Sequence, residues 1–492
     1  MSADLLASFD KLAHPRVLVL GDFIVDRYTW GNAERVSQEA PVILLRADTR
    51  EARLGGAGNV CAMLHGLEAQ VTAAGVVGDD ADGRTLRDLL VQAHADTSCV
   101  MLDPSRPTTV KERFIGRAQG RHPHQILRVD NEVRDALRPE LEKRLGDRLL
   151  DMLSQHDIVL VSDYDKGVCT PRLLRLVIDH CRSSGIPVLV DPIRSTDYTR
   201  YRGATSMTPN RTEAGMATGI SIETSDDALR AGRKLCRELK LDLAIVTLDR
   251  DGMALVMPDG RGEVFPTKPR AVYDITGAGD MVLSMIGVAL ASGLEPAEAI
   301  RLGNIAGGLE VEKVGVAVIP RTEICARLLS DRSSTQGKLV GLDQLSNFAQ
   351  THRAMGQKIV MAGGCFDLLH VGHVRHLEEA ARLGDVLVVA LNSDASARRL
   401  KGAGRPVIGQ RDRAAMLAAL ACVGYVTVFD DATPIELVKR VRPDVLVKGG
   451  NYRRDQVVGH EFVASYGGEV CVTPMIDGIS TSGIVSAVQK AA

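Results

Sequence analysis

The sequence has few aromatic residues, no long hydrophobic run and no excess of charge of either sign. Aromatic residues make up 3% of its 492 residues, so a binding site walled by aromatic rings is not expected. The longest apolar stretch, residues 281–294, is interrupted by Ser and Gly and is too short to cross a bilayer. The first sixteen residues lack the cationic and apolar segments of a secretory signal. We therefore expect a cytoplasmic protein with no membrane partner.

Charge and cysteine usage exclude further classes. The 60 Lys and Arg residues nearly balance 62 Asp and Glu, with no basic arm, so no nucleic-acid partner is expected. Nine scattered cysteines form neither a CxxC motif nor a Cys/His cluster, which argues against a disulfide framework and a zinc site. Such usage is typical of a reducing compartment.

Short runs of β-branched residues and Leu are present along most of the chain, bounded by Gly, Pro or Asp. They alternate with amphipathic helical patterns, which predicts an α/β fold with doubly wound parallel sheets buried on both faces. The length suggests about two to four domains. The strand-like runs are residues 16–22, 157–163, 186–192, 243–249, 358–364, 385–394 and 444–450.

One polar stretch, residues 331–355, lacks such a run and predicts a linker. It would separate a large domain, residues 1–330, from a smaller one, residues 356–492. Within the large domain, residues 27–46 and 108–130 mix polar and β-prone residues and predict a small sheet that covers a site as a lid.

The segment Asp274–Asp280, DITGAGD, precedes an apolar helix. Small residues there let the backbone approach an anion at the helix start. Asp280 beside that anion suits a base that accepts a hydroxyl proton during attack on a γ-phosphate, although an ordinary N-terminal cap is the alternative. A second glycine turn, residues 54–60, carries Asn59, which can hydrogen-bond a polyol. Asn210 and Glu213, three apart after a strand, could hold Mg²⁺ through water.

These motifs, in this order, resemble the ribokinase family of sugar kinases over residues 10–320. The resemblance implies that Asp280 is the catalytic base, that MgATP is the phosphate donor, and that Gly277, Ala278 and Gly279 form an anion hole. It also implies that residues 162–167, 191–192 and 246–252, which include Lys166 and Asp249, lie along the nucleotide side, with a solvated lysine as the alternative for Lys166. The residues implied to face the sugar are Asp22, Asn32, Gly56 and Asn59.

A second motif, HxGH, follows the strand-like run at residues 358–364. His370 and His373 lie three apart where a helix should begin, so both rings share one face near its N-terminus. Two imidazoles there can stabilise the charge that develops when an oxygen attacks an α-phosphate. No third ligand stands at metal spacing, so a metal site is the weaker interpretation. Lys401, Arg405 and Lys448 supply cations, and residues 480–482 form either a helix cap or a phosphate contact.

Residues 356–492 resemble the cytidylyltransferase-like nucleotidyltransferases, in a subgroup that adds adenylate to a sugar 1-phosphate. The expected smaller domain is therefore Rossmann-like. The resemblance implies that His370 and His373 stabilise the transition state and that Lys401 and Lys448 neutralise phosphates. Thr481 would touch the nucleotide, and Asp367 and Asn392 would orient the site.

The two halves together resemble the bifunctional heptose-7-phosphate kinase/heptose-1-phosphate adenylyltransferase family. The resemblance implies small-molecule partners, sugar phosphates and ATP, and a homodimer formed through the kinase lid. Among the cations of the second lid piece, Lys111 and Arg113 are our candidates for binding the sugar phosphate, while Arg121 and Arg128 could equally be solvated. The same two chemistries on another sugar phosphate, or one domain acting only as a nucleotide sensor, remain alternatives.

Overall fold

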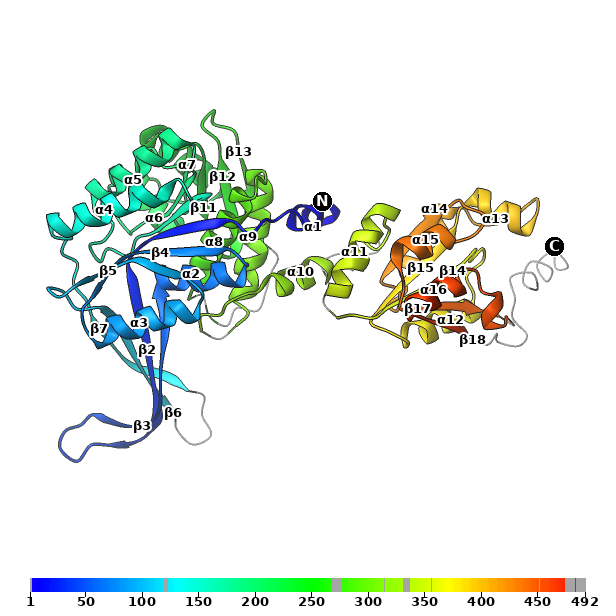
Figure 1. The fold of residues 1–492 in the computed structure, drawn as a ribbon, viewed down its shortest axis with the longest axis horizontal. Helices are drawn as coiled ribbons and strands as arrows, with labels where there is room; N and C mark the ends of the chain where they lie inside the picture. Colours follow the sequence, from blue (N-terminus) through cyan, green and yellow to red (C-terminus); the bar gives the residue numbers. More distant parts are fainter. Residues whose placement is uncertain are drawn as a thin grey trace. The chain divides into compact units, whose positions relative to one another are not determined.

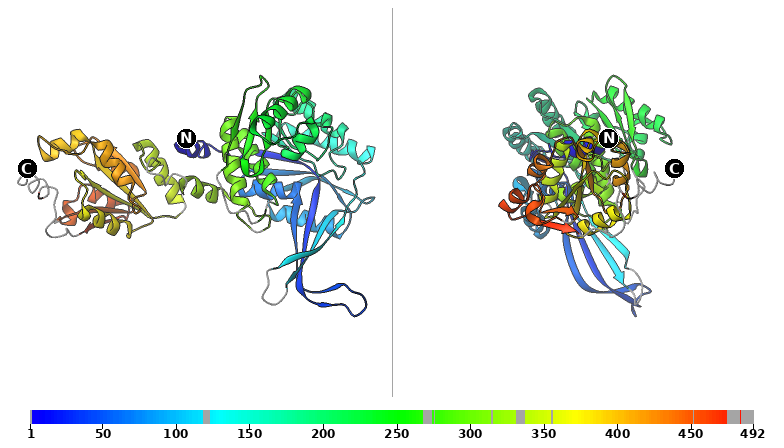
Figure 2. Two further views of the ribbon diagram at one scale, coloured as in Figure 1. Left: turned by 180° about the vertical axis from the view of Figure 1, so that it is seen from behind. Right: turned by 90° about the vertical axis from the view of Figure 1, so that its right-hand side faces the viewer.

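The computed structural model of the chain describes residues 2–117, 123–267, 274, 276–313, 315–330, 337–354, 356–450, 452–473 and 483. The chain divides into two compact units: a first unit, residues 7–325, and a second unit, residues 326–492 together with residues 1–6. Each unit is built on a parallel sheet flanked by helices (Figures 1 and 2). The α/β class predicted from the sequence is confirmed. Within the described ranges, no helix combines the length and apolar character that crossing a bilayer requires.

The central sheet of the first unit reverses its strand order between β1 and β8. From β1 the chain builds outward through β4 and β5, and from β8 it builds the other way. Ligands of open α/β sheets bind at the carboxyl ends of strands at such a reversal. In spatial order the strands are β10 (Ser206–Met207), β9 (Val188–Asp191), β8 (Ile158–Ser162), β1 (Arg16–Gly21), β4 (Gln70–Gly78) and β5 (Asp96–Asp103).

Alternate residues of the central strands face different helices. Val159 and Val161 of β8 belong to a core cluster with α4 (Pro139–Leu153) and α5 (Pro171–Ser184). Leu160 between them points to the other face, where Gly287 of α8 (Ala278–Ala291) leaves room for it. Because strand side chains alternate between faces, the sheet is buried on both sides.

The predicted lid is a four-stranded sheet that projects from the body of the first unit (Figure 1). β2 pairs antiparallel with β3 and parallel with β6, and β6 pairs antiparallel with β7. Both long strands meet the central domain: β2 begins just after β1, and β3 ends where α2 begins. The bounds are β2 (Phe23–Val36), β3 (Ile43–Gly56), β6 (Thr109–Arg117), β7 (His124–Asn131) and α2 (Ala57–Gly66).

A bridge between Asn210 and Thr247 links the edge of the central sheet to a small antiparallel sheet. This sheet consists of β11 (Ala244–Thr247), β12 (Met253–Val256) and β13 (Gly262–Phe265). The other helices of the range 2–330 are α1 (Ser2–Phe9), α3 (Ala81–Gln92), η1 (Thr199–Tyr201), α6 (Arg211–Thr218), α7 (Ser225–Leu239), η2 (Asp249–Asp251), α9 (Pro296–Glu310) and α10 (Arg321–Ser330).

The second unit has a five-stranded parallel sheet whose order reverses between β14 and β17. Its strands, in spatial order, are β16 (Tyr425–Phe429), β15 (Val386–Asn392), β14 (Ile359–Gly364), β17 (Val445–Gly449) and β18 (Glu469–Thr473). Its helices are α11 (Leu342–Ala354), α12 (Val371–Ala381), α13 (Asp394–Lys401), α14 (Gln410–Ala418), α15 (Ile435–Val441), η3 (Arg454–Gln456) and α16 (His460–Ser465).

The stretch predicted as a linker, residues 331–355, is largely part of the second unit. Its helix α11 packs there, because Phe348 stacks on Tyr425 and the imidazole Nε2 of His352 lies 2.9 Å from the Tyr425 hydroxyl. Leu339 forms a bridge with Val426 at the edge strand β16. The polar sequence concealed this role because the stretch has few apolar residues, although Val340, Leu345, Phe348 and Ala349 among them are buried.

Candidate active sites

Asp280 lies in the first turn of α8 and is buried. The side-chain Nδ2 of Asn59, from α2, donates a hydrogen bond of 2.6 Å to Asp280 Oδ2. The hydroxyl of Tyr164, which follows β8, donates one of 3.2 Å to Oδ1. Burial raises the pKa of Asp280 to about 6, while these two hydrogen bonds lower it. The carboxylate is therefore charged at pH 7 and can accept a proton.

The glycines of the two predicted turns allow close backbone approach. Gly277, with φ of 97°, caps α8, and Gly56, with φ of 56°, precedes α2. A Cβ on Gly56 would lie 2.5 Å from the backbone oxygen of Asp22. Gly279 is exposed, and a Cβ on it would meet no atom within 4 Å, so the start of α8 beside Ala278 is open to a ligand.

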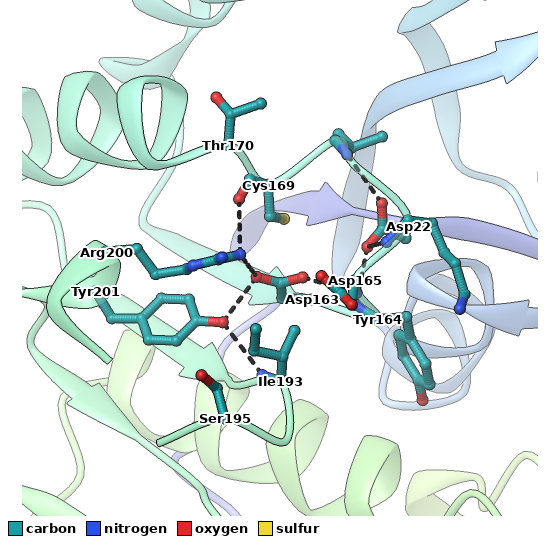
Figure 3. A network of polar contacts seen from close by, with 12 residues as sticks. Asp22, Asp163, Tyr164, Asp165, Cys169, Thr170, Ile193, Ser195, Arg200 and Tyr201 are labelled. Atoms are coloured by element: carbon teal, nitrogen blue, oxygen red, sulfur yellow. Dashed lines mark hydrogen bonds and ion pairs between the residues drawn. The ribbon is translucent and has the colours of Figure 1, made fainter. Parts of the chain in front are cut away.

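Asp22 was expected to face the sugar, and the structure gives it a different role. Its buried carboxylate accepts backbone N–H groups from Tyr164, Lys166 and Val168, at 2.9, 3.0 and 3.2 Å. Figure 3 shows these contacts beneath the loop after β8. Burial raises the pKa of Asp22, against these hydrogen bonds. Asp22 thus holds the loop, because the donors occupy both of its oxygens.

Asp26, on β2 four residues beyond Asp22, lies among the charged groups near Asp280. It forms an ion pair of 2.6 Å with Arg113. Arg113 lies on β6, opposite Tyr28 of β2. Its charge raises the pKa of Asp280, whereas the charge of Lys111 lowers it. Burial in turn lowers the pKa of Lys111, whose Nζ lies 5.1 Å from the Tyr164 ring centroid. Lys111 and Arg113 therefore lie beside the base, at the root of the lid.

Lys166 was expected on the nucleotide side, which the structure does not support. Its Nζ forms an ion pair of 2.8 Å with Glu132, just beyond β7, and its charge lowers the pKa of Lys111. Lys166 therefore lies on the lid side of Asp280. It is buried, so it is not a solvated surface lysine either.

Asn32 does not lie near Asp280 and the cations beside it. It lies six residues beyond Asp26 on β2, on the order of 20 Å further along the lid at the rise of a strand. Its side-chain oxygen accepts the backbone N–H of Glu34, at an irregularity in the pairing of β2 with β3. Of the other lid cations, Arg128 forms an ion pair with Asp130, and Arg121 lies outside the described residues.

Asn210 and Glu213 form a reciprocal capping box at the start of α6, with hydrogen bonds of 3.0 and 2.9 Å. This local role accounts for their spacing without a metal ion. Asp191, at the end of β9, provides a further acid close by, because the charges of Asp280 and Glu213 add to burial in raising its pKa. Asp249 follows β11, is exposed, and lies 3.6 Å from Arg211.

The second site begins where β14 ends. His370 is the N-cap of α12 and His373 lies in its first turn, with ring centroids 3.8 Å apart in a stacked arrangement. The His370 backbone N–H points to His373 Nδ1 at 3.4 Å, and we therefore assign the ring proton to Nε2. Burial, followed by the charges of His370 and Lys401, lowers the pKa of His373 to about 4.

Two lysines approach these imidazoles from different elements. Lys401 ends α13, and its charge lowers the pKa of both His370 and His373. Lys448 lies on β17, across the strand reversal from β14, and its charge lowers the pKa of His376. The predicted set of two imidazoles and two lysines is therefore gathered at one end of the sheet. Thr481 lies outside the described residues.

Asp367 and Asn392 make contacts within the protein around this site. Asp367 is fully buried and forms an ion pair with Arg405, which is therefore engaged within the protein. The side-chain Nδ2 of Asn392 donates to Ser396 Oγ at 3.0 Å. Beside them, an open hollow of about 630 Å³ lies at the carboxyl ends of β15 and β16, and the exposed Arg398 and Arg411 are among its lining residues.

Comparisons with known proteins agree with this division. Residues 15–323 match the model of the pfkB family carbohydrate kinases, and residues 361–485 match a cytidylyltransferase-like model. The "Bifunctional protein HldE" of Geotalea uraniireducens is 45% identical over 98% of this chain and 97% of its own length. That of Geobacter sulfurreducens is 45% identical over 96% of each chain. The chain belongs to the HldE family.

Solved structures support the fold of the kinase half of this HldE family member. Ribokinase from Arabidopsis thaliana, with ribose and ATP, matches with a TM-score of 0.52 and 20% identity over 64% of this chain and 99% of its own. Phosphofructokinase-2 from Escherichia coli, with substrates and products, matches with a TM-score of 0.53 and 19% identity over the same shares. The predicted ribokinase-like and nucleotidyltransferase architectures are confirmed.

Sequence reasoning missed one residue of the kinase site in this HldE family member, Asp26. Asp26 was missed because its role depends on Arg113, from a strand about ninety residues away in sequence. Tyr164 and Asp191 lie in segments that were expected along the nucleotide side; Tyr164 follows β8 and Asp191 ends β9, at the carboxyl edge of the sheet. That position was a usable signal, because residues directly after parallel strands line the ligand crevice.

Proposed function

We propose that the protein phosphorylates D-glycero-β-D-manno-heptose 7-phosphate at O1 to the 1,7-bisphosphate. After a separate phosphatase has removed the 7-phosphate, the second site joins heptose 1-phosphate to adenylate, giving ADP-heptose and pyrophosphate for lipopolysaccharide core synthesis. The observation that carries this proposal is the presence, in one chain of the HldE family, of two separate clusters of residues suited to phosphate chemistry. Asp280 accepts hydrogen bonds from Asn59 and Tyr164, and the two histidines of the HxGH motif are accompanied by Lys401 and Lys448.

In the kinase reaction, Asp280 accepts the proton of the anomeric hydroxyl as its oxygen attacks the γ-phosphorus of ATP, and ADP leaves. The open backbone at Gly277, Ala278 and Gly279 receives the transferring phosphoryl group. Lys111, Arg113 and Lys166 are the cations available at the lid root for the 7-phosphate. Lys166 is buried and Lys111 is half-buried, which strengthens their attraction for a dianion.

Mg²⁺ is expected to enter with ATP and to neutralise charge on its β- and γ-phosphates. The local donors fit this ion, because Asn210 and Glu213 supply amide and carboxylate oxygens, and Glu213 uses only Oε2 in the capping box. Burial raises the pKa of Glu213. A nearby cation would favour its charged form.

In the adenylyl transfer, an oxygen of the sugar 1-phosphate attacks the α-phosphorus of a second ATP, and pyrophosphate leaves. His373 Nε2–H and the His370 ring stabilise the charge that develops on the α-phosphate. Lys401 and Lys448 neutralise the other phosphates, with Thr481 as a nucleotide contact. Arg398 and Arg411 in the adjoining hollow offer cations for the sugar phosphate.

We further propose a cytoplasmic homodimer that pairs through the lid. Large apolar side chains are exposed on the lid, with Ile43 and Leu127 each 54% exposed, and a second copy would cover them. A cytoplasmic location agrees with the free thiols of all nine cysteines and with the need for ATP.

The test is to incubate the purified chain with MgATP and a panel of heptose, hexose and pentose phosphates, and to identify products by mass. We expect the heptose 7-phosphate to gain one phosphate at the anomeric position, and heptose 1-phosphate to yield ADP-heptose. Equal or faster turnover of a hexose or pentose phosphate would replace the heptose assignment with another sugar.

A further inference from the structure

The loop after β8 connects the centre of the sheet to the catalytic base of the kinase. β1 and β8 are parallel neighbours, with Gly21 opposite Ser162, so Asp22 and Asp163 leave the sheet side by side. Both carboxylates are buried. Their oxygens and the thiol of Cys169 lie within 4.8 Å of one another, which is spacing that could suit a cation.

The donors around these carboxylates indicate an anchor for the loop. Asp22 accepts the backbone N–H groups of Tyr164, Lys166 and Val168, and Asp163 accepts that of Asp165 at 3.0 Å. Asp165 and Gly167 have φ of 57° and 87°. These two left-handed residues alternate with residues of negative φ. The alternation turns successive backbone N–H groups toward the two carboxylates.

Asp163 is held from the opposite side. The Tyr201 hydroxyl donates a hydrogen bond of 2.7 Å to Asp163 Oδ2, and a guanidinium nitrogen of Arg200 lies 3.5 Å from the same oxygen. Figure 3 shows this network, with the ring of Tyr164 leaving it toward the other side of the loop. The anchored loop therefore leaves one side chain, Tyr164, free to reach Asp280.

We propose that Tyr164 is a positioning residue of the kinase, which holds the base Asp280 by a hydrogen bond, and that Asp22 fixes Tyr164 by anchoring its loop. This assignment rests on the kinase function proposed above. It replaces a direct sugar contact for Asp22 with an indirect effect on the base. The phenol must act as a donor, and burial, with the charge of Asp280, raises the pKa of Tyr164 so that it keeps its proton.

Other charged groups also face Asp280. They are Asp26 from β2, Lys111 from β6, Asp191 from β9 and Glu310 from α9, in addition to the neutral amide of Asn59. Glu310 is buried, and burial raises its pKa to about 8, so it is mostly neutral near pH 7. None of these groups is substituted in Tyr164→Phe or Asp22→Asn. A changed pH profile of the kinase in either variant would therefore report the loss of the hydrogen bond between Tyr164 and Asp280.

The experiment measures kinase kcat/KM against pH for the full chain and for Tyr164→Phe. A hydrogen bond to the charged carboxylate lowers its pKa, so removing the hydroxyl should move the acidic limb to higher pH. We expect kcat at pH 6 to fall on the order of tenfold, with partial recovery by pH 8, and the KM for sugar to change little. Tyr198→Phe is the matched control, because it removes another buried tyrosine hydroxyl of the same unit, one without a hydrogen-bond partner among the described residues.

Asp22→Asn tests the anchor. The carboxamide cannot accept all three N–H groups, so the variant should reproduce the moved acidic limb, with a thermal unfolding scan to show that it is folded. A rise in the KM for sugar with an unmoved limb would return Asp22 to the sugar site. A Tyr164→Phe profile that superimposes on that of the unaltered protein would overturn the proposal, even if heptose turnover itself were established.

Discussion

The key residues of the two centres differ in charge at neutral pH, although both are deprotonated. Asp280 has its pKa raised to about 6 by burial and is still mostly charged at pH 7. His373 has its pKa lowered to about 4 by burial and neighbouring cations, so it is neutral. A charged acid suits proton removal, and a neutral imidazole suits hydrogen-bond donation to a phosphate.

These states predict different pH profiles for the two activities of the same chain. The base works deprotonated, so kinase kcat/KM should fall as the pH drops through about 6. Adenylyl transfer should show no limb from His373 between pH 5 and 8, because its pKa of about 4 lies below that range. Initial rates in a constant-ionic-strength buffer series would check this. A kinase limb well above pH 7 would contradict the environment described for Asp280.

Single substitutions should separate the activities. Asp280→Asn should abolish heptose bisphosphate formation and leave ADP-heptose formation from the 1-phosphate unchanged, because the two sites lie in different units. His373→Ala should slow adenylyl transfer by about 10²–10³-fold, as for loss of one transition-state donor, and leave the kinase intact. Each variant is the control for the other. Loss of both activities in one folded variant would contradict two independent sites.

At the scale of elements, the start of α8 contains two glycines with different reasons to be small. Gly277 adopts φ of 97°, and a Cβ there would lie 2.9 Å from Glu310 Oε1. Gly279 lies within the helix and borders open space. Gly277 is required by the left-handed backbone conformation, and Gly279 leaves room for a ligand.

Two alanine variants would distinguish these reasons. Gly277→Ala should lower stability by about 1–2 kcal/mol, the cost of a left-handed conformation with a Cβ. Gly279→Ala should keep the unfolding temperature, since Ala favours helix, but raise the KM for ATP or lower kcat. Thermal unfolding and kinase kinetics would be measured together. Unaltered kinetics in Gly279→Ala would show that no phosphate approaches this residue.

Elements governed by local sequence were predictable, and contacts between distant elements were not. The strands, the glycine turns and the HxGH helix start follow from periodicity and from residues a few positions apart. The assignments of Asp22 and Lys166 depended on which side of a loop faces which strand, and sequence does not encode this locally. Asn210 and Glu213 were correctly paired, yet their spacing also satisfies a helix cap, and pattern alone cannot separate the two uses.

At the scale of the whole molecule, the apolar surface of the lid bears on assembly. We expect the protein to sediment as a dimer, at twice its mass of 52.9 kDa. Replacing Ile43 and Leu127 together by Asp should yield monomers, because charges on both would oppose burial of this surface. Analytical ultracentrifugation would measure the change, with Leu176→Asp on α5 as an exposed control outside the lid. A dimer that survives the double substitution would place the interface elsewhere.

The lid meets the domain at residues that also govern the base. β2 begins one residue after Asp22, and β3 ends at Gly56, three residues before Asn59. A tilt of the lid ribbon would therefore pivot on the backbone that carries both supports of Asp280: the loop anchor on one side and the amide donor on the other. Lid movement on sugar binding and proton abstraction by Asp280 would depend on the same backbone, so a ligand that shifts the lid would also change the reactivity of the Asp280 carboxylate.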